Sequence, residues 1–119
     1  MRPAIGSRCG RARTLLYVWS DACTADVVAA LENPAWRVRE MCAKVAARWE
    51  VAAAADASLV LVDDDTPRVR AAAVRVLGVT GEAERAVGIR YALDDPEHAV
   101  RNAAERALRQ LEDRLDRSL

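Results

Sequence analysis

Histidine, glycine and phenylalanine are scarce in this sequence, which contains one histidine, five glycines and no phenylalanine. The lone His98 excludes metal centres built from repeated histidine ligands, and five scattered glycines leave no glycine-rich loop for binding phosphate. A cysteine–histidine nucleophilic pair would have to join His98 to Cys23 or Cys42, which lie more than 50 residues earlier in the chain. We therefore predict that the protein is not an enzyme and has no catalytic residue, metal site or cofactor.

Net charge and long hydrophobic runs are also missing. The 18 basic residues equal the 18 acidic ones, so no overall field draws the chain onto nucleic acid or a membrane. The run LLYV at 15–18 is too short to span a bilayer, and no apolar stretch typical of an export signal precedes it. The three cysteines, Cys9, Cys23 and Cys42, form no CxxC pair, which favours reduced thiols. We predict a cytoplasmic protein that does not associate with membranes.

What the sequence does contain is a repeat of 31 residues. A Val-Arg pair recurs at 38–39, 69–70 and 100–101, and the same step backwards from Arg39 reaches Arg8. A fixed period in this range is typical of stacked repeat architectures. We therefore expect a single domain over residues 1–119 whose first copy is a half repeat. The predicted units are a half repeat over 1–20 and full repeats over 24–50, 55–80 and 84–118.

Each full repeat predicts two helices joined by a turn. The first helices are short and apolar, and we expect them at 24–32, 54–62 and 81–93. The turns contain residues suited to a helix N-cap, each followed by a proline that is favoured at the first helical position. These pairs are Asn33-Pro34, Thr66-Pro67 and Asp95-Pro96. The second helices follow with apolar residues at helical spacing. No β-hairpin signal is present, so we predict an all-α fold.

The segments DDDTPRVRAAAVRVLG at 63–78 and DDPEHAVRNAAERAL at 94–108 resemble HEAT-type repeats, specifically the short phycobilisome-lyase HEAT-like class. The resemblance covers roughly residues 24 to 112. It implies a right-handed α-solenoid of stacked antiparallel helix pairs, with the first helices on the convex side and the second helices on the concave side. HEAT-type di-iron hydroxylases use repeated His-Glu pairs, which this chain lacks.

A polar residue and an arginine stand six residues apart in every full repeat. This spacing resembles the inter-repeat ladder of the family, in which the arginine ties a turn to the next unit. The guanidinium group forms a fork that suits a carboxylate at a helix N-terminus, and the interface between repeats partly excludes water. We interpret these residues as structural. They are Asn33 with Arg39, Asp64 with Arg70, and Asp95 with Arg101.

A second basic position recurs with the same period, at Arg13, Lys44, Arg75 and Arg106, and is called the basic column below. It lies about 140° from the centre of the apolar helix face, so it is expected to face solvent on the concave side. Of the four, only Lys44 has an acidic residue four positions earlier. We predict that the column binds an acidic protein segment or phosphate groups; the alternative is a solvated surface of an arginine-rich chain.

Aspartates crowd the turns and would repel a long polyanion, and no aromatic residues alternate with the basic column to stack bases. A protein partner is therefore expected in preference to nucleic acid. The predicted function is a non-catalytic protein-interaction scaffold or adaptor that uses the concave face. Two alternatives stay open: a lyase-like subunit that handles a chromophore or acts as a chaperone, and nucleic-acid binding along the basic column.

The N-terminal half repeat lacks a first helix, so its apolar residues need a cover. Aromatic residues at an uncovered end are typical of interfaces, which predicts dimerisation or partner docking there. The candidates are Leu15, Leu16, Tyr17 and Trp19. Alternatively, residues 1–20 fold back and cap the stack themselves. At the other end, we expect the last helix to act as a cap with charged residues such as Arg114 facing water.

Overall fold

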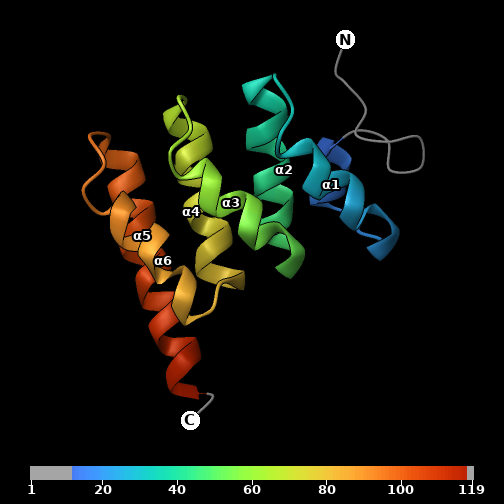
Figure 1. Ribbon diagram of the computed structural model, residues 1–119. Helices are drawn as coiled ribbons and strands as arrows, with labels where there is room; N and C mark the ends of the chain where they lie inside the picture. Colours follow the sequence, from blue (N-terminus) through green and yellow to red (C-terminus); the bar gives the residue numbers. More distant parts are fainter. Residues whose placement is uncertain (1–11, 118–119) are drawn as a thin grey trace.

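The computed structural model describes residues 12–117, and all the regular structure in that range is helical (Figure 1). The α-helices are α1 (Thr24–Ala30), α2 (Trp36–Arg48), α3 (Ala55–Leu61), α4 (Pro67–Thr80), α5 (Ala86–Ala92) and α6 (His98–Arg117). Short 3-10 helices precede them at η1 (Ala12–Leu16), η2 (Asp21–Cys23), η3 (Ala52–Ala54) and η4 (Ala83–Arg85). Within residues 12–117, no helix is long and apolar enough to cross a membrane.

The helices form two layers. The second helices α2, α4 and α6 pack side by side in chain order, and each first helix packs on the second helix of its own repeat (Figure 1). The thinnest dimension of the molecule is 20 Å, which equals two helix diameters. This arrangement of stacked helix pairs confirms the predicted all-α solenoid.

The first helices are shorter than expected. Each has seven residues and is preceded by one turn of 3-10 helix, at η2, η3 and η4. The prediction of a helix over 81–93 was wrong at its start, because Gly81 and Glu82 have extended backbones and the α-helix begins only at Ala86.

The turns before α2 and α6 differ from the prediction, whereas α4 begins as predicted, at Pro67 after the N-cap residue Thr66. The side-chain oxygens of Asn33, Asp64 and Asp95 each accept a hydrogen bond of 2.9 Å from the backbone N–H two residues later. Each of the three therefore closes an Asx turn just before the helix. Asn33 and Asp95 are not the N-caps that we expected. The N-cap of α2 is Ala35, and that of α4 is Thr66, whose side chain makes no capping bond.

The core between the layers consists mainly of alanine, valine and leucine. Gly78 lets α4 approach α6 closely, because a Cβ atom at this position would lie 2.8 Å from the Cα of Ala107. Ser58 is a polar exception: it is fully buried and its hydroxyl has no hydrogen-bond partner. The other repeats place Val27 and Ile89 at this position, so the fold tolerates an apolar side chain there.

Candidate functional site

The ladder residues connect one repeat to the next. Arg39 donates from Nε and Nη2 to the two carboxylate oxygens of Asp64, at 2.9 and 3.3 Å, and from Nη1 to the backbone oxygen of Asn33 at 2.8 Å. Arg70 repeats this geometry with Asp95, at 2.8 and 3.2 Å, and with the backbone oxygen of Asp64. One guanidinium group thus holds its own turn and the turn of the following repeat.

Arg101 occupies the same position in the last repeat. Its Nη1 donates to the backbone oxygen of Asp95 at 2.7 Å, so it holds its own turn in the same way. The Arg70–Asp95 pair is well shielded, since the two side chains are 13% and 4% exposed. Burial alone would raise the pKa of Asp95, but the hydrogen bonds from Arg70 and from the Glu97 backbone N–H outweigh it and lower the pKa.

The basic column lies five residues beyond the ladder arginines on the same helices. Arg75 and Arg106 are exposed, and neither forms an ion pair with another residue in the described part of the chain. Lys44 is half-buried and lies 3.5 Å from the Oε2 of Glu40, the acidic residue four positions earlier. Arg13 is exposed, but it lies on η1 rather than on an α-helix, so its geometry differs from that of the other three.

A group of basic residues around Trp36 was missed by the sequence analysis. The guanidinium carbons of Arg37 and Arg68 lie 4.9 and 5.6 Å from the centre of the Trp36 ring. The Nε of Arg68 also donates to the Oε2 of Glu40 at 2.9 Å, the same oxygen that Lys44 approaches. We call Trp36, Arg37, Glu40, Lys44 and Arg68 the tryptophan cluster. The sequence does contain one indication of it, because Arg37 and Arg68 are 31 residues apart. The next step of the same length reaches Ala99, so the basic position does not recur in the last repeat.

Charges are separated between the two layers although they cancel in the whole chain. The first helices and turns, at 20–35, 50–66 and 81–97, hold 13 of the 18 acidic residues and only two basic ones. Helices α2 and α4 hold seven basic residues and a single acidic one, Glu40. The second-helix face, meaning the exposed side of α2, α4 and α6, therefore has a positive local field over α2 and α4.

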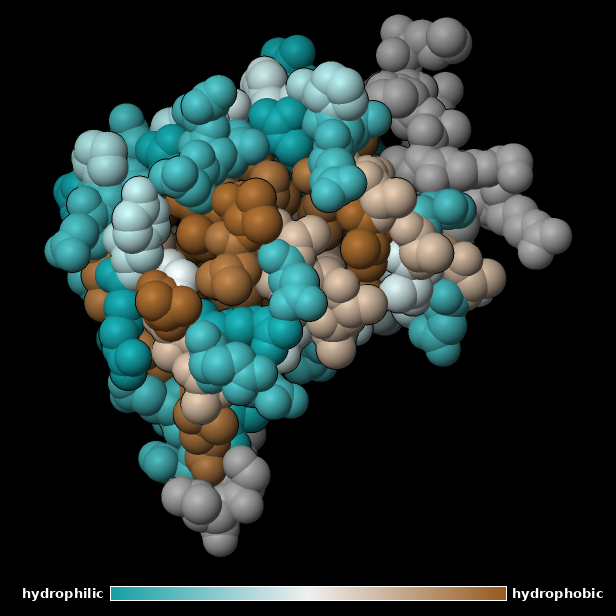
Figure 2. Space-filling model, viewed as in Figure 1, coloured by the Kyte–Doolittle hydropathy of each residue, from teal (hydrophilic) through white to brown (hydrophobic). Residues whose placement is uncertain are grey.

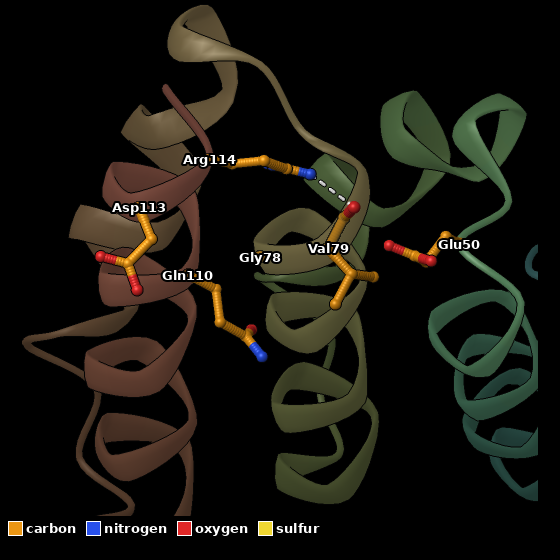
Figure 3. A pocket seen from close by; sticks show the side chains of 6 residues that line it. All are labelled: Glu50, Gly78, Val79, Gln110, Asp113 and Arg114. Atoms are coloured by element: carbon orange, nitrogen blue, oxygen red, sulfur yellow. Dashed lines mark hydrogen bonds between the residues drawn. The ribbon is translucent and has the colours of Figure 1, made fainter. Parts of the chain in front are cut away.

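A shallow cavity of about 190 Å³ lies at one end of the second-helix face. Its lining consists of Glu50, Gly78, Val79, Gln110, Asp113 and Arg114 (Figure 3). Arg114 does not simply face water, as the sequence suggested: it donates to the backbone oxygens of Val79 and Gly81 at the end of α4. The carboxylates of Glu50 and Asp113 are exposed, so this cavity provides a polar surface without a desolvated reactive group.

In the described part of the chain, Cys23, Cys42 and His98 have different surroundings. Cys42 is a free buried thiol whose pKa is raised to about 12 by burial, so it stays protonated near neutral pH. Cys23 is disulfide-bonded, which contradicts the expectation that all three thiols are reduced. His98 is exposed, and its Nε2 lies 3.0 Å from the amide nitrogen of Asn102. Among residues 12–117, no group of three or more His, Cys, Asp or Glu residues could hold a metal ion.

Most of the predicted N-terminal interface packs inside the molecule. Leu15 is buried, and Leu16 and Trp19 pack against the core. The Trp19 ring stacks on that of Trp49 with the centroids 6.4 Å apart, and the indole N–H of Trp49 donates to the backbone oxygen of Leu15 at 2.6 Å. Only Tyr17 of the four candidates is largely exposed, at 77%. Arg8, which extends the repeat towards residue 1, lies outside the described residues.

Hydrophobic side chains are exposed on the opposite layer. Figure 2 shows hydrophobic surface over α3, surrounded by more hydrophilic residues. The exposed large hydrophobic residues of the first helices are Val60 on α3 and Val87 and Tyr91 on α5. The Tyr91 hydroxyl donates to the carboxylate of Asp63 at 2.9 Å. These side chains therefore lie on the acidic layer and not on the second-helix face.

The stacking of helix pairs makes this an α-solenoid protein, and arginine–aspartate ion pairs join successive repeats. The chain belongs to the HEAT-repeat family: the sequence profile of HEAT repeats matches residues 24–113, which is most of its length. HEAT repeats generally mediate protein–protein interactions. No curated protein matches the sequence.

Proposed function

We propose that this protein is a non-catalytic scaffold or adaptor that binds an acidic segment of a protein partner on its second-helix face, the concave face of a HEAT solenoid. The observation that carries the proposal is the pair of exposed arginines, Arg75 and Arg106, which form no ion pair with the described residues. Their own chain offers acidic residues mainly on the other layer, so carboxylates must come from another molecule.

The separation of charge also supports a protein partner over nucleic acid. A long polyanion on the second-helix face would extend past the aspartate-rich turns, such as 63–65, which repel phosphates. A short acidic segment can stay within the width of the basic surface. Binding should therefore weaken with added salt, but with the shallow dependence of a few ion pairs.

The proposal also includes the repeat class, the cellular location and the N-terminal interface that the sequence predicts. A place in the phycobilisome-lyase class rests on the resemblance of two segments, and a cytoplasmic location rests on composition. A lyase-like role would need an accessible thiol or a carboxylate in a cleft. Cys42 is buried, and the carboxylates in the cavity are those of Glu50 and Asp113. Among the described residues, docking or dimerisation at the N-terminal end would use Tyr17 and the neighbouring Val18, which are 77% and 65% exposed.

The test is affinity capture from a nuclease-treated native lysate with the wild type and the double variant Arg75→Glu, Arg106→Glu. We expect the variant to lose a protein partner that the wild type retains at low salt. The control is Arg90→Glu, which reverses an exposed arginine of the first helix α5, away from the second-helix face, and should retain that partner. An identical set of partners for the wild type and both variants would contradict the proposal. A partner that the wild type captures from untreated lysate but not from nuclease-treated lysate would favour nucleic acid.

A further inference from the structure

We infer that the partner segment is an extended chain in the polyproline II conformation with a carboxylate at every third residue, and that it is anchored at the tryptophan cluster. This inference rests on the proposed function and specifies the chemistry of its partner. It follows from the spacing of the basic residues, from the donors that the tryptophan cluster leaves unused, and from the lack of large exposed hydrophobic side chains on α2 and α4.

The spacing of cations across the second-helix face is set by helix packing. Helices α2, α4 and α6 pack in order, and packed helix axes are about 8–10 Å apart. Lys44, Arg75 and Arg106 occupy the same position on these three helices, so they recur at about this interval. A polyproline II chain rises about 3.1 Å per residue with three residues per turn, so every third side chain points the same way at intervals of about 9 Å. The two periods match.

The other common peptide conformations fit less well. In a β-strand, side chains on one face recur every second residue, at about 6.6 Å, which is too short for the helix spacing. An amphipathic helix would need a hydrophobic groove on the second-helix face. The large exposed hydrophobic side chains of the described residues lie on α3, on α5, at Tyr17 and Val18, and at Leu115, and none lies on α2 or α4. An extended acidic chain is therefore the better complement.

The tryptophan cluster supplies the strongest point of attachment. Its three cations and one carboxylate leave an excess of two positive charges, compared with one at Arg75 and one at Arg106. Arg68 uses its Nε for Glu40, while its two terminal nitrogens form no hydrogen bond with the described residues. Arg37 forms no ion pair with them either, and both guanidinium groups are positioned over the Trp36 ring. Two forks with unused N–H donors suit bidentate binding of an incoming carboxylate.

The experiment compares two fluorescein-labelled peptides of equal composition, EPPEPPE and EEEPPPP, by fluorescence anisotropy at low salt. The first presents a glutamate at every third residue of a proline-rich chain, and the second groups its glutamates at one end. We expect the first to bind the wild type at least about fivefold more tightly, because three cations on successive helices can be engaged together. Equal affinities would overturn the inference, because binding would then depend on the charge of the peptide and not on its spacing. The proposed function would still be compatible with that result.

Protein variants locate the anchor. Arg37→Gln with Arg68→Gln should weaken EPPEPPE about tenfold, and Arg75→Gln should weaken it about threefold. Arg90→Gln on the first helix α5 is the control and should leave affinity unchanged. Because Arg68 also pairs with Glu40, the Arg75→Gln variant, which removes no internal ion pair, keeps the test independent of folding. A loss of affinity in Arg90→Gln equal to that in Arg37→Gln with Arg68→Gln would overturn the assignment of the site.

Two further outcomes separate the inference from the proposed function. If neither peptide binds while capture from lysate still depends on Arg75 and Arg106, the inference fails and the proposed function stands. A peptide with phosphoserine in place of the central glutamate should bind with similar affinity, within about threefold. A gain of more than about tenfold would overturn the assignment of carboxylate as the ligand and identify a phosphorylated partner.

Discussion

Two sets of basic residues share the second helices, five positions apart, and the structure treats them in opposite ways. Arg70 is largely shielded and gives its whole fork to a carboxylate of the next repeat and the backbone of its own turn, whereas Arg75 extends into solvent. The residue type is the same and the helix is the same. The difference lies in the direction of the side chain relative to the interface between repeats, which decides whether a guanidinium group holds the fold or is free to meet another molecule.

The largest effect should come from Arg70→Ala set beside Arg75→Ala. Removing Arg70 leaves Asp95, whose side chain is 4% exposed, without its counter-charge, and should cost about 3 kcal/mol of the free energy of unfolding. Removing Arg75 should change it by less than about 0.5 kcal/mol. Urea denaturation followed by circular dichroism measures both. Similar losses of unfolding free energy in the two variants would contradict the assignment of Arg70 to the fold and of Arg75 to the solvent-exposed surface.

The interface between repeats can also be disturbed without changing charge. Gly78→Ala puts a methyl group 2.8 Å from the Cα of Ala107 and 2.9 Å from the side-chain oxygen of Gln110. Alanine is the better helix former by about 1 kcal/mol, but overpacking against the backbone of α6 should outweigh this, with a net loss of about 1–2 kcal/mol. A higher melting temperature in Gly78→Ala would show that α4 and α6 can separate at little cost.

A smaller effect of opposite sign is expected at Ser58. Its hydroxyl is buried without a hydrogen-bond partner, so Ser58→Ala removes an unsatisfied polar group and should raise the free energy of unfolding by about 1 kcal/mol. The comparison with Arg70→Ala is informative, because Ser58→Ala removes a buried polar group without a partner, whereas Arg70→Ala removes one that is paired with Asp95. Thermal melts of the two variants compare them directly, and a clear loss of stability in Ser58→Ala would indicate a partner for the hydroxyl, such as an internal water.

The mildest way to test the ladder is to change pH. The pKa of Asp95 is lowered in the folded protein, so the unfolded chain binds its proton more readily. The stabilisation from this carboxylate is therefore present above its unfolded pKa of about 3.9 and is lost as pH falls further through the folded pKa. Asp95→Asn should reduce the slope of stability against pH in this acidic range. Denaturation curves at several pH values measure it, and parallel slopes for the variant and the wild type would contradict the prediction.

The sequence predicted those features that repeat in every unit. The 31-residue period located the second helices and the ladder positions, because each recurs wherever the same local surroundings recur. Of the basic column, Arg75 and Arg106 are exposed as expected, but Lys44 is half-buried. The tryptophan cluster escaped because it breaks the period: Ala99 stands where Arg37 and Arg68 stand, and only folding brings Arg68 over Trp36. The starts of α2 and α6 were misplaced by two residues, since an Asx turn and an N-cap use the same residue types, whereas α4 begins at Pro67 as predicted.

Contacts specific to one end of the stack were equally hidden. Arg114 binds the backbone oxygens at the end of α4 because α6 continues beyond the point where its neighbours stop, and no other repeat has an equivalent bond among the described residues. The N-terminal copy, expected as a second helix, provides the five-residue η1 within the described range. Trp19 and Trp49 stack there and use apolar surface that would otherwise need a partner. A period describes the middle of a solenoid better than its ends.

The separation of charge between the two layers gives the described part of this molecule a dipole moment. A neutral dipole feels no net force in a uniform electric field, but the field of a nearby charged body exerts a torque on it and turns it before contact. An acidic partner would thus meet the second-helix layer first, and a basic partner would meet the aspartate-rich turns. The layers therefore influence the orientation of approach as well as the strength of binding, and this influence fades once ions in the solution screen distances beyond about 10 Å.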